Sequence, residues 1–238
     1  MNWIDWLHAF FTDPALQSGP DAIPHRIAEH LAYTVESLAW ATLLAVPLGL
    51  LLGYLGRGAV LATVLTGTAR ALPTLGLVTL VVLLAGVGKA STVIPLVVLA
   101  IPPLLVGAVE GVRGTDPQLR DAARGIGLTH PQVLRQVCFP AALPSLLAGL
   151  RTATIQVIAT ATVAAYVGMG GLGRYVIDGL ALRKYYVVAG GAVLVVALAL
   201  AAQLFFALLI RYALPPGSRP VRRGTVRKGA VRLRRSTG

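Results

Sequence analysis

Long apolar runs separated by short polar intervals make up most of this chain of 238 residues. A helix needs about 20 apolar residues to cross the hydrocarbon core of a bilayer. Five runs reach that range, and we expect a membrane-spanning helix in each: residues 37–56, 59–88, 92–109, 145–167 and 187–209. The pattern therefore predicts an all-α, polytopic membrane protein with five transmembrane helices.

The second run, residues 59–88, is too long for one straight crossing. Arg70 and Pro73 divide it, because a charge is costly in hydrocarbon and proline interrupts helical hydrogen bonding. We expect residues 59–69 to lie near the inner surface or to lead steeply into the membrane. The crossing itself then includes residues 72–85.

The first run contains Pro47 and the spacing Gly49-x-x-x-Gly53. Proline bends a membrane helix, and small residues four apart let a neighbouring backbone come close. This run is therefore expected to kink or to pack closely against another helix.

Charged residues are distributed unevenly along the chain. Five of the nine acidic residues precede the first apolar run, and nine of the twenty-one basic residues lie from Arg211 onward. Membrane proteins keep Lys and Arg on the cytoplasmic side. We therefore expect the N-terminus outside and the C-terminus inside, with the turn at Arg57 and the polar interval at residues 112–144 also inside.

Composition argues against an ordinary soluble protein. The chain is 56% hydrophobic and 13% charged, whereas soluble domains carry about 25% charged residues. A net charge of +12 also occurs in nucleic-acid-binding proteins. The apolar runs favour a multi-pass protein of the cell membrane instead, and the basic tail lacks the interleaved aromatic residues that bind nucleic acid.

Three segments follow from these patterns: an external or interfacial segment at residues 1–36, a membrane domain at 37–212, and a basic cytoplasmic tail at 213–238. Aromatic and aliphatic residues of the first segment lie near one helical face: Trp3, Trp6, Leu7, Phe10 and Phe11. They indicate a helix at the outer headgroups, or one packed against the bundle. We expect the tail to be disordered or to lie along anionic lipid.

The polar interval at residues 112–144 carries clear helix signals. Asp116 can cap a helix that starts at Pro117, and Gly125 and Gly127 can end it. Thr129 can then cap a second helix, with Pro131 just inside its start. Four arginines stand in or beside the interval: Arg113, Arg120, Arg124 and Arg135. We therefore predict two short helices in a basic cytoplasmic loop.

This interval resembles the signature loop of permease subunits of ATP-binding-cassette (ABC) importers. That signature reads Glu-Ala-Ala, three residues, Gly, nine residues and Ile-x-Leu-Pro. Here Asp121-Ala122-Ala123, Gly127 and Val137-Cys138-Phe139-Pro140 stand at the same spacing, with Asp, Val and Phe as mild departures. The resemblance implies a coupling helix that docks on an ATPase subunit through Asp116, Asp121, Ala122, Ala123, Gly127 and Pro140. A solvated loop between two membrane helices is the alternative.

The fourth apolar run contains polar residues at helical spacing. Thr152, Gln156 and Thr160 are four residues apart and share one face of a helix. A polar stripe in a membrane helix faces protein or water rather than lipid. It indicates either a translocation pathway between subunits or adhesion between helices through hydroxyls and small residues.

Four further stretches resemble the osmoprotectant branch of these permeases: residues 29–34, 71–74, 149–154 and 168–173. The resemblance covers residues 15–212 and implies import of glycine betaine, choline, carnitine or a related solute. Methionine permeases share the five-span plan and the coupling loop. The glycines in residues 168–173 formally match a dinucleotide motif, but they follow a membrane helix rather than a strand, so we expect a tight turn there.

No catalytic or metal-binding set is evident. The four histidines are scattered, and no phosphate-cradling G-x-x-x-x-G-K-[ST] sequence occurs. We therefore expect no cofactor on this chain and no enzyme activity of its own. The resemblance implies that ATP and Mg²⁺ are used by partner ATPase subunits, and that a second permease subunit and an external solute-binding protein complete the importer.

A self-contained secondary transporter or channel is the alternative from another class. Such a protein needs ionisable groups inside the membrane to couple ion movement to transport. Only Arg70, Glu110 and Arg151 approach the predicted membrane region, and each lies near an inner end. The sequence therefore favours the ATP-driven importer.

Overall fold

The computed structural model describes residues 2–56, 58, 60, 64, 73–167 and 170–213. Within these ranges every regular element is a helix: α1 (Trp3–Thr12), η1 (Pro14–Leu16), α2 (Ile23–Tyr54), α4 (Thr74–Ala85), α5 (Lys89–Arg113), α6 (Pro117–Gly125), α7 (His130–Val133), η2 (Leu134–Cys138), α8 (Phe139–Ala164), η3 (Ala165–Val167), α9 (Gly173–Ala181) and α10 (Tyr185–Ala213). The all-α prediction is confirmed. Most of the predicted surface segment at 59–69, Arg70 and nearly all of the tail lie outside the described residues.

Four helices in the described ranges are long and apolar enough to cross a membrane: Ile23–Tyr54, Lys89–Arg113, His130–Val167 and Tyr185–Tyr212. They contain the third, fourth and fifth predicted crossings in full and residues 37–54 of the first. The 12-residue α4 corresponds to most of the second. The helices Ile23–Tyr54 and His130–Val167 begin well before the predicted positions 37 and 145. Hydropathy marks the apolar part of a helix and not the point where its hydrogen bonding starts.

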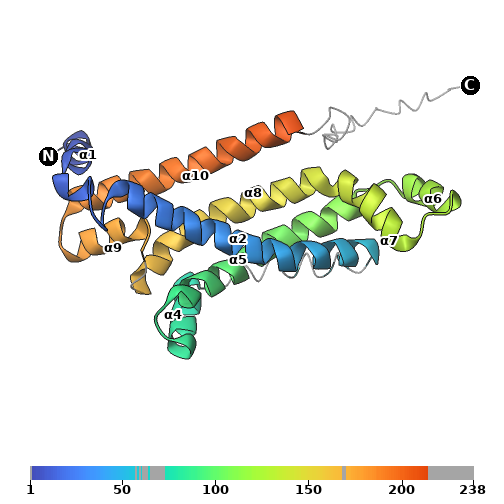
Figure 1. Cartoon of the computed structure of the whole chain (residues 1–238), viewed down its shortest axis with the longest axis horizontal. Helices are drawn as coiled ribbons and strands as arrows, with labels where there is room; N and C mark the ends of the chain where they lie inside the picture. The colour runs from blue at the N-terminus through green and yellow to red at the C-terminus, as the bar shows by residue number, and fades with distance from the viewer. Residues whose placement is uncertain are drawn as a thin grey trace, which may run out of the picture.

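Two contacts show how the long helices run. Lys89, at the start of α5, forms an ion pair with Glu36 of α2, with 2.6 Å between Nζ and Oε2. Tyr54, at the end of α2, forms a hydrogen bond with His130 of α7, with 2.7 Å between Oη and Nδ1. Helices α2 and α5 therefore run in the same direction, from the end of the bundle that carries α9 to the end that carries α6 (Figure 1). We call these the α9 end and the α6 end.

Helix α5 forms the centre of the bundle, and its Leu96, Ala100 and Leu104 are almost fully buried. It packs in one apolar cluster with Ala41 of α2 and Val157 of α8. Because α5 has a neighbour on each side, its position fixes the geometry of both interfaces.

Glycines bring the three backbones close together. A Cβ added to Gly49 would lie 2.6 Å from the Cβ of Ala108, and one added to Gly149 would lie 2.7 Å from the carbonyl oxygen of Pro103. Both distances are shorter than van der Waals contact, so α5 can approach α2 and α8 only where these residues lack a side chain. The close approach predicted from Gly49 is confirmed, and its partner is α5.

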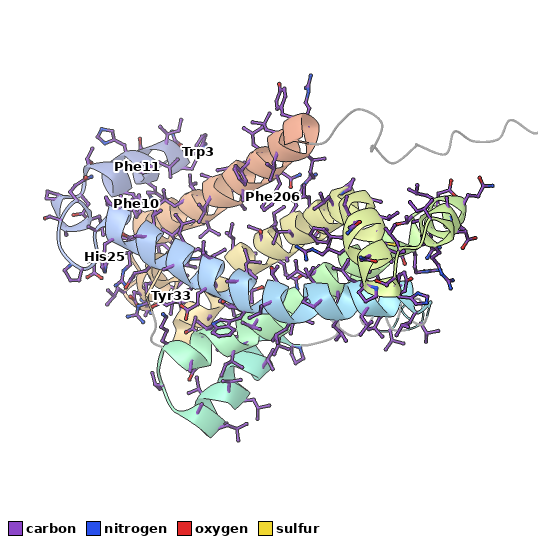
Figure 2. The ribbon with its side chains drawn as sticks, turned by 45° about the vertical axis from the view of Figure 1, so that its right-hand side comes forward. Trp3, Phe10, Phe11, His25, Tyr33 and Phe206 are labelled. Carbon is purple, nitrogen blue, oxygen red and sulfur yellow. The ribbon has the colours of Figure 1, made fainter. Side chains whose placement is uncertain are left out.

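The helices at the α9 end form a separate apolar cluster. Phe10 of α1 is buried and makes an edge-to-face contact with Tyr175 of α9, with 5.4 Å between ring centroids. Burial raises the pKa of Tyr175 to about 12, and its hydroxyl donates to the carbonyl oxygen of Asp21 at 2.5 Å. Trp3 and Phe11 are exposed (Figure 2). Some aromatic residues of α1 therefore pack against the bundle, as Phe10 does, and others do not.

Candidate functional site

The loop between α5 and α8 lies at the α6 end of the bundle (Figure 1). The Asp116 carboxylate accepts a hydrogen bond from the Gln118 N–H at 2.9 Å and caps α6. Gly127 follows the helix with a φ of 94°, a conformation that favours glycine. The predicted start and end of the first short helix are therefore confirmed.

The second predicted short helix is not a separate element. Thr129 and Gln132 form a capping box at the start of α7, as the sequence suggested. The helix then continues through the π-helical turn η2 into α8, as one stretch from His130 to Val167. A wider turn just before Pro140 suits a residue that has no N–H to donate and whose ring crowds the preceding turn.

The residues of the signature separate into buried and exposed positions. Ala123 is buried in an apolar cluster with Val112, Val133 and Cys138, and so anchors α6 to the bundle. Asp121, Ala122, Gly127 and Pro140 are exposed. Asp116, which caps α6, is exposed too, so five of the six predicted coupling residues are accessible to a partner and only Ala123 is buried.

Two exposed apolar side chains of this loop were not among the predicted site residues. Leu119 is 52% exposed and Ile126 is 81% exposed. They are seven residues apart, a spacing that places two residues on the same side of a helix. That spacing was visible in the sequence, and it indicates a surface suited to an apolar partner.

Helix α2 also contacts this loop. Besides its hydrogen bond, Tyr54 makes an edge-to-face contact with the His130 ring, with 5.9 Å between centroids. The two residues are 76 positions apart in the sequence, so no local pattern could have paired them. The contact joins the loop to a third long helix, α2, in addition to α5 and α8, which flank it.

A groove with a volume of about 490 Å³ runs between α5 and α8. It is lined by Pro102, Pro103, Val106, Gly107, Glu110, Ser145, Ala148, Gly149, Thr152 and Gln156. Two of the three residues of the predicted polar stripe, Thr152 and Gln156, therefore lie in one groove. Thr160 does not line it and is 9% exposed, buried inside the bundle.

The hydroxyls of this helix are bonded within it. Thr152 donates to the Ala148 carbonyl oxygen at 3.0 Å, and Thr154 donates to that of Leu150 at 2.8 Å. Close contact between α5 and α8 comes instead from Gly107 and Gly149. Across to α10, the Arg151 Nε donates to the Gln203 Oε1 at 2.7 Å, which gives this arginine of α8 a polar partner.

At the α9 end, α2 holds the connection between α8 and α9. The Glu29 carboxylate accepts from the Gly171 N–H at 2.9 Å, and it lies where a Cβ on Gly170 would stand. Gly171 has a φ of 87°, so the expected tight turn is confirmed at these two glycines. Gly168 and Met169 lie outside the described residues. Among the described residues, no three His, Cys, Asp or Glu side chains form a group that could hold a metal ion.

Known proteins match this chain over most of its length. Residues 45–219 match the family described as binding-protein-dependent transport system inner membrane component. A choline transport system permease protein of Bacillus subtilis (strain 168) is 33% identical over 202 residues, covering 85% of this chain and 93% of the relative. A glycine betaine/carnitine/choline transport system permease protein of the same organism matches with the same identity and coverage.

A solved structure titled as inward-facing conformations of the MetNI methionine ABC transporter has a TM-score of 0.69. It is 23% identical and covers 81% of this chain and 96% of that one, which shows a shared fold. The long apolar helices agree with a multi-pass protein of the inner membrane. The chain belongs to the family of binding-protein-dependent transport system inner membrane components.

Proposed function

We propose that this chain is the transmembrane permease subunit of an ATP-driven importer for an osmoprotectant such as glycine betaine, choline or carnitine. The observation that carries the proposal is α6, a capped helix with exposed Asp121 and Ala122, followed directly by exposed Ile126, at one end of the membrane bundle. The solutes are those for which relatives that match 85% of the chain are named.

In this proposal the ATPase subunits dock on α6. The ATPase subunits, and not this chain, bind and use ATP and Mg²⁺. Leu119 and Ile126 enter an apolar groove of the ATPase, because an exposed apolar pair gains free energy when a partner buries it. Asp121, Ala122, Gly127 and Pro140 line the same contact. Ala123 transmits the movement of α6 to the bundle through its apolar cluster.

The five-span topology belongs to the same proposal, with the α6 end in the cytoplasm. Helices α2 and α5 run in the same direction, so the chain after Tyr54 at the α6 end has to return to the α9 end before Lys89. That return is a second crossing, to which α4 belongs. The acidic residues of the N-terminal segment then face outward, and the basic loop and tail face inward.

The α5–α8 groove forms part of the translocation pathway, with Thr152 and Gln156 toward the solute. A second permease subunit, either another copy or a related chain, closes the open side of the groove. An external binding protein delivers solute at the α9 end. Thr160, inside the bundle, supports the pathway helix.

The test is to tag this chain, purify it gently from its native membranes and identify the proteins that accompany it. We expect an ATPase and a solute-binding protein, and a second permease chain if the pair is a heterodimer. The recovered complex, in liposomes, is then assayed for ATP-dependent uptake of choline, glycine betaine, carnitine and methionine. A chain that comes out alone and transports solute without ATP would contradict the importer and support a self-contained transporter.

A further inference from the structure

The α5–α8 groove contains a carboxylate for which the proposed pathway has so far no use. Glu110 lines the groove together with small apolar residues, two hydroxyls and one amide. We propose that Glu110 is a specificity-determining residue that attracts the quaternary ammonium group of a solute at the α6 end of this groove. The inference rests on the proposed function and extends it to the charge of the solute.

The position of Glu110 follows from the direction of the helices. Helix α5 runs toward the α6 end, so Glu110 lies nearer that end than Pro102, and at 1.5 Å per residue the two are about 12 Å apart along the helix axis. Helix α8 runs the opposite way, so Gln156 lies at the other end of the groove from Ser145. A solute leaving the middle of the bundle therefore passes Gln156 and Thr152 before it reaches Glu110.

The lining matches the chemistry of a methylated ammonium. Such a group has no N–H, so a site can recognise it only by charge and by contact with its methyl groups. Glu110 supplies the negative charge, and Pro102, Pro103 and Val106 supply apolar side chains that can contact the methyl groups. The volume of about 490 Å³ lies within the range of about 300–1,000 Å³ that is usual for small-molecule pockets.

The polar residues suit the other end of the same solutes. The Thr152 hydroxyl donates its proton to the Ala148 carbonyl oxygen, so its free lone pairs can accept from the hydroxyl of choline. The Gln156 amide can donate to the carboxylate of glycine betaine or carnitine. Thr152 and Gln156 lie toward the opposite end of the groove from Glu110, so they contact a solute before it reaches the carboxylate and not at the same time.

The charges around the α6 end explain why a carboxylate is needed there. Arg113, Arg120, Arg124 and Arg135 all lie in or beside the loop at that end, and together they repel a cation. Glu110 is the one acidic residue in the lining of the groove. Its ion pair with Arg113, 3.0 Å from Nη1 to Oε1, has side chains 52% and 43% exposed, so it is a weak, solvent-screened pair that a solute cation can rearrange.

The test compares variants of the purified complex, reconstituted with its ATPase and binding protein, for uptake of radiolabelled choline and glycine betaine. Glu110→Gln is expected to lower choline uptake by about threefold to tenfold at limiting solute and glycine betaine uptake by less than about twofold, because only choline carries a net charge. Glu36→Gln is the matched control, since it also breaks an ion pair with a basic residue of α5 but lies outside the groove.

Arg113→Gln separates recognition from stability. It breaks the same ion pair and leaves the Glu110 carboxylate free, so choline uptake is expected to rise by about twofold or more. If the ion pair were only structural, choline uptake would fall in both Glu110→Gln and Arg113→Gln. Equal loss of both solutes in Glu110→Gln, or a fall in choline uptake in Arg113→Gln, would overturn the inference and leave the importer intact. A wild-type complex that imports neither solute would contradict the proposed function itself.

Discussion

A single imidazole, that of His30, connects three parts of the chain that lie far apart in sequence. Its Nδ1 accepts from the Leu172 N–H at 3.3 Å, and its Nε2 donates to the Ile158 carbonyl oxygen at 3.0 Å. A neutral ring with its proton on Nε2 satisfies both bonds. The side chain is 1% exposed, so water cannot take its place, and the turn at residues 170–172 depends on this ring for one backbone partner.

His30→Ala is therefore expected to loosen the turn between α8 and α9. Leaving the buried Leu172 N–H unpaired costs about 1–3 kcal/mol, so the unfolding temperature of the purified complex falls and amide exchange at residues 170–175 speeds up. His30→Asn restores part of the effect, because the Asn Oδ1 can accept near the position of Nδ1. His8→Ala is the control, since His8 is an exposed histidine of α1; equal behaviour of the two alanine variants would contradict this role.

At the scale of the element, capping chemistry was enough to predict α6. Asp116, Pro117 and Gly127 act locally, and a local signal is read correctly from sequence because it needs no distant partner. The continuation of α7 into α8 was missed because a π-helical turn depends on how the preceding helix packs. The groove was only half predicted: helical spacing grouped Thr160 with Thr152, but packing against the rest of the bundle buried it.

The exposed apolar pair on α6 gives the prediction that belongs to this element. Ile126→Ser is expected to weaken retention of the ATPase by about tenfold or more, because burial of an isoleucine side chain is worth about 1.5–3 kcal/mol. Solute-stimulated ATP hydrolysis falls with it, while the unfolding temperature of the chain stays the same. Leu182→Ser, at another exposed apolar position, beyond α9, serves as the control for ATPase retention.

Asp121→Arg should act in the same direction as Ile126→Ser, because it reverses a charge on the exposed side of the same helix. Full retention of the ATPase and normal stimulated hydrolysis in both variants would rule out α6 as the docking element.

At the scale of the whole molecule, the contacts between helices constrain the topology more than hydropathy does. Hydropathy and length identify four candidate spans in the described ranges and leave α4 too short to count. The contacts at Glu36–Lys89 and Tyr54–His130 place the start of α5 beside the middle of α2 and the end of α2 beside the loop after α5. Two neighbouring helices that run in the same direction require the chain between them to return, which favours an odd number of crossings.

Labelling of introduced cysteines from one side of the membrane tests this topology. The native Cys138 is buried and is expected to stay unreactive, so exposed positions such as Ser18 and Gln118 can each carry a single reactive thiol. With five crossings, Ser18→Cys reacts with an impermeant reagent in intact cells, and Gln118→Cys reacts only after permeabilisation. Four crossings would expose both thiols on the same side, so labelling of both in intact cells would exclude the return crossing and the cytoplasmic position of α6.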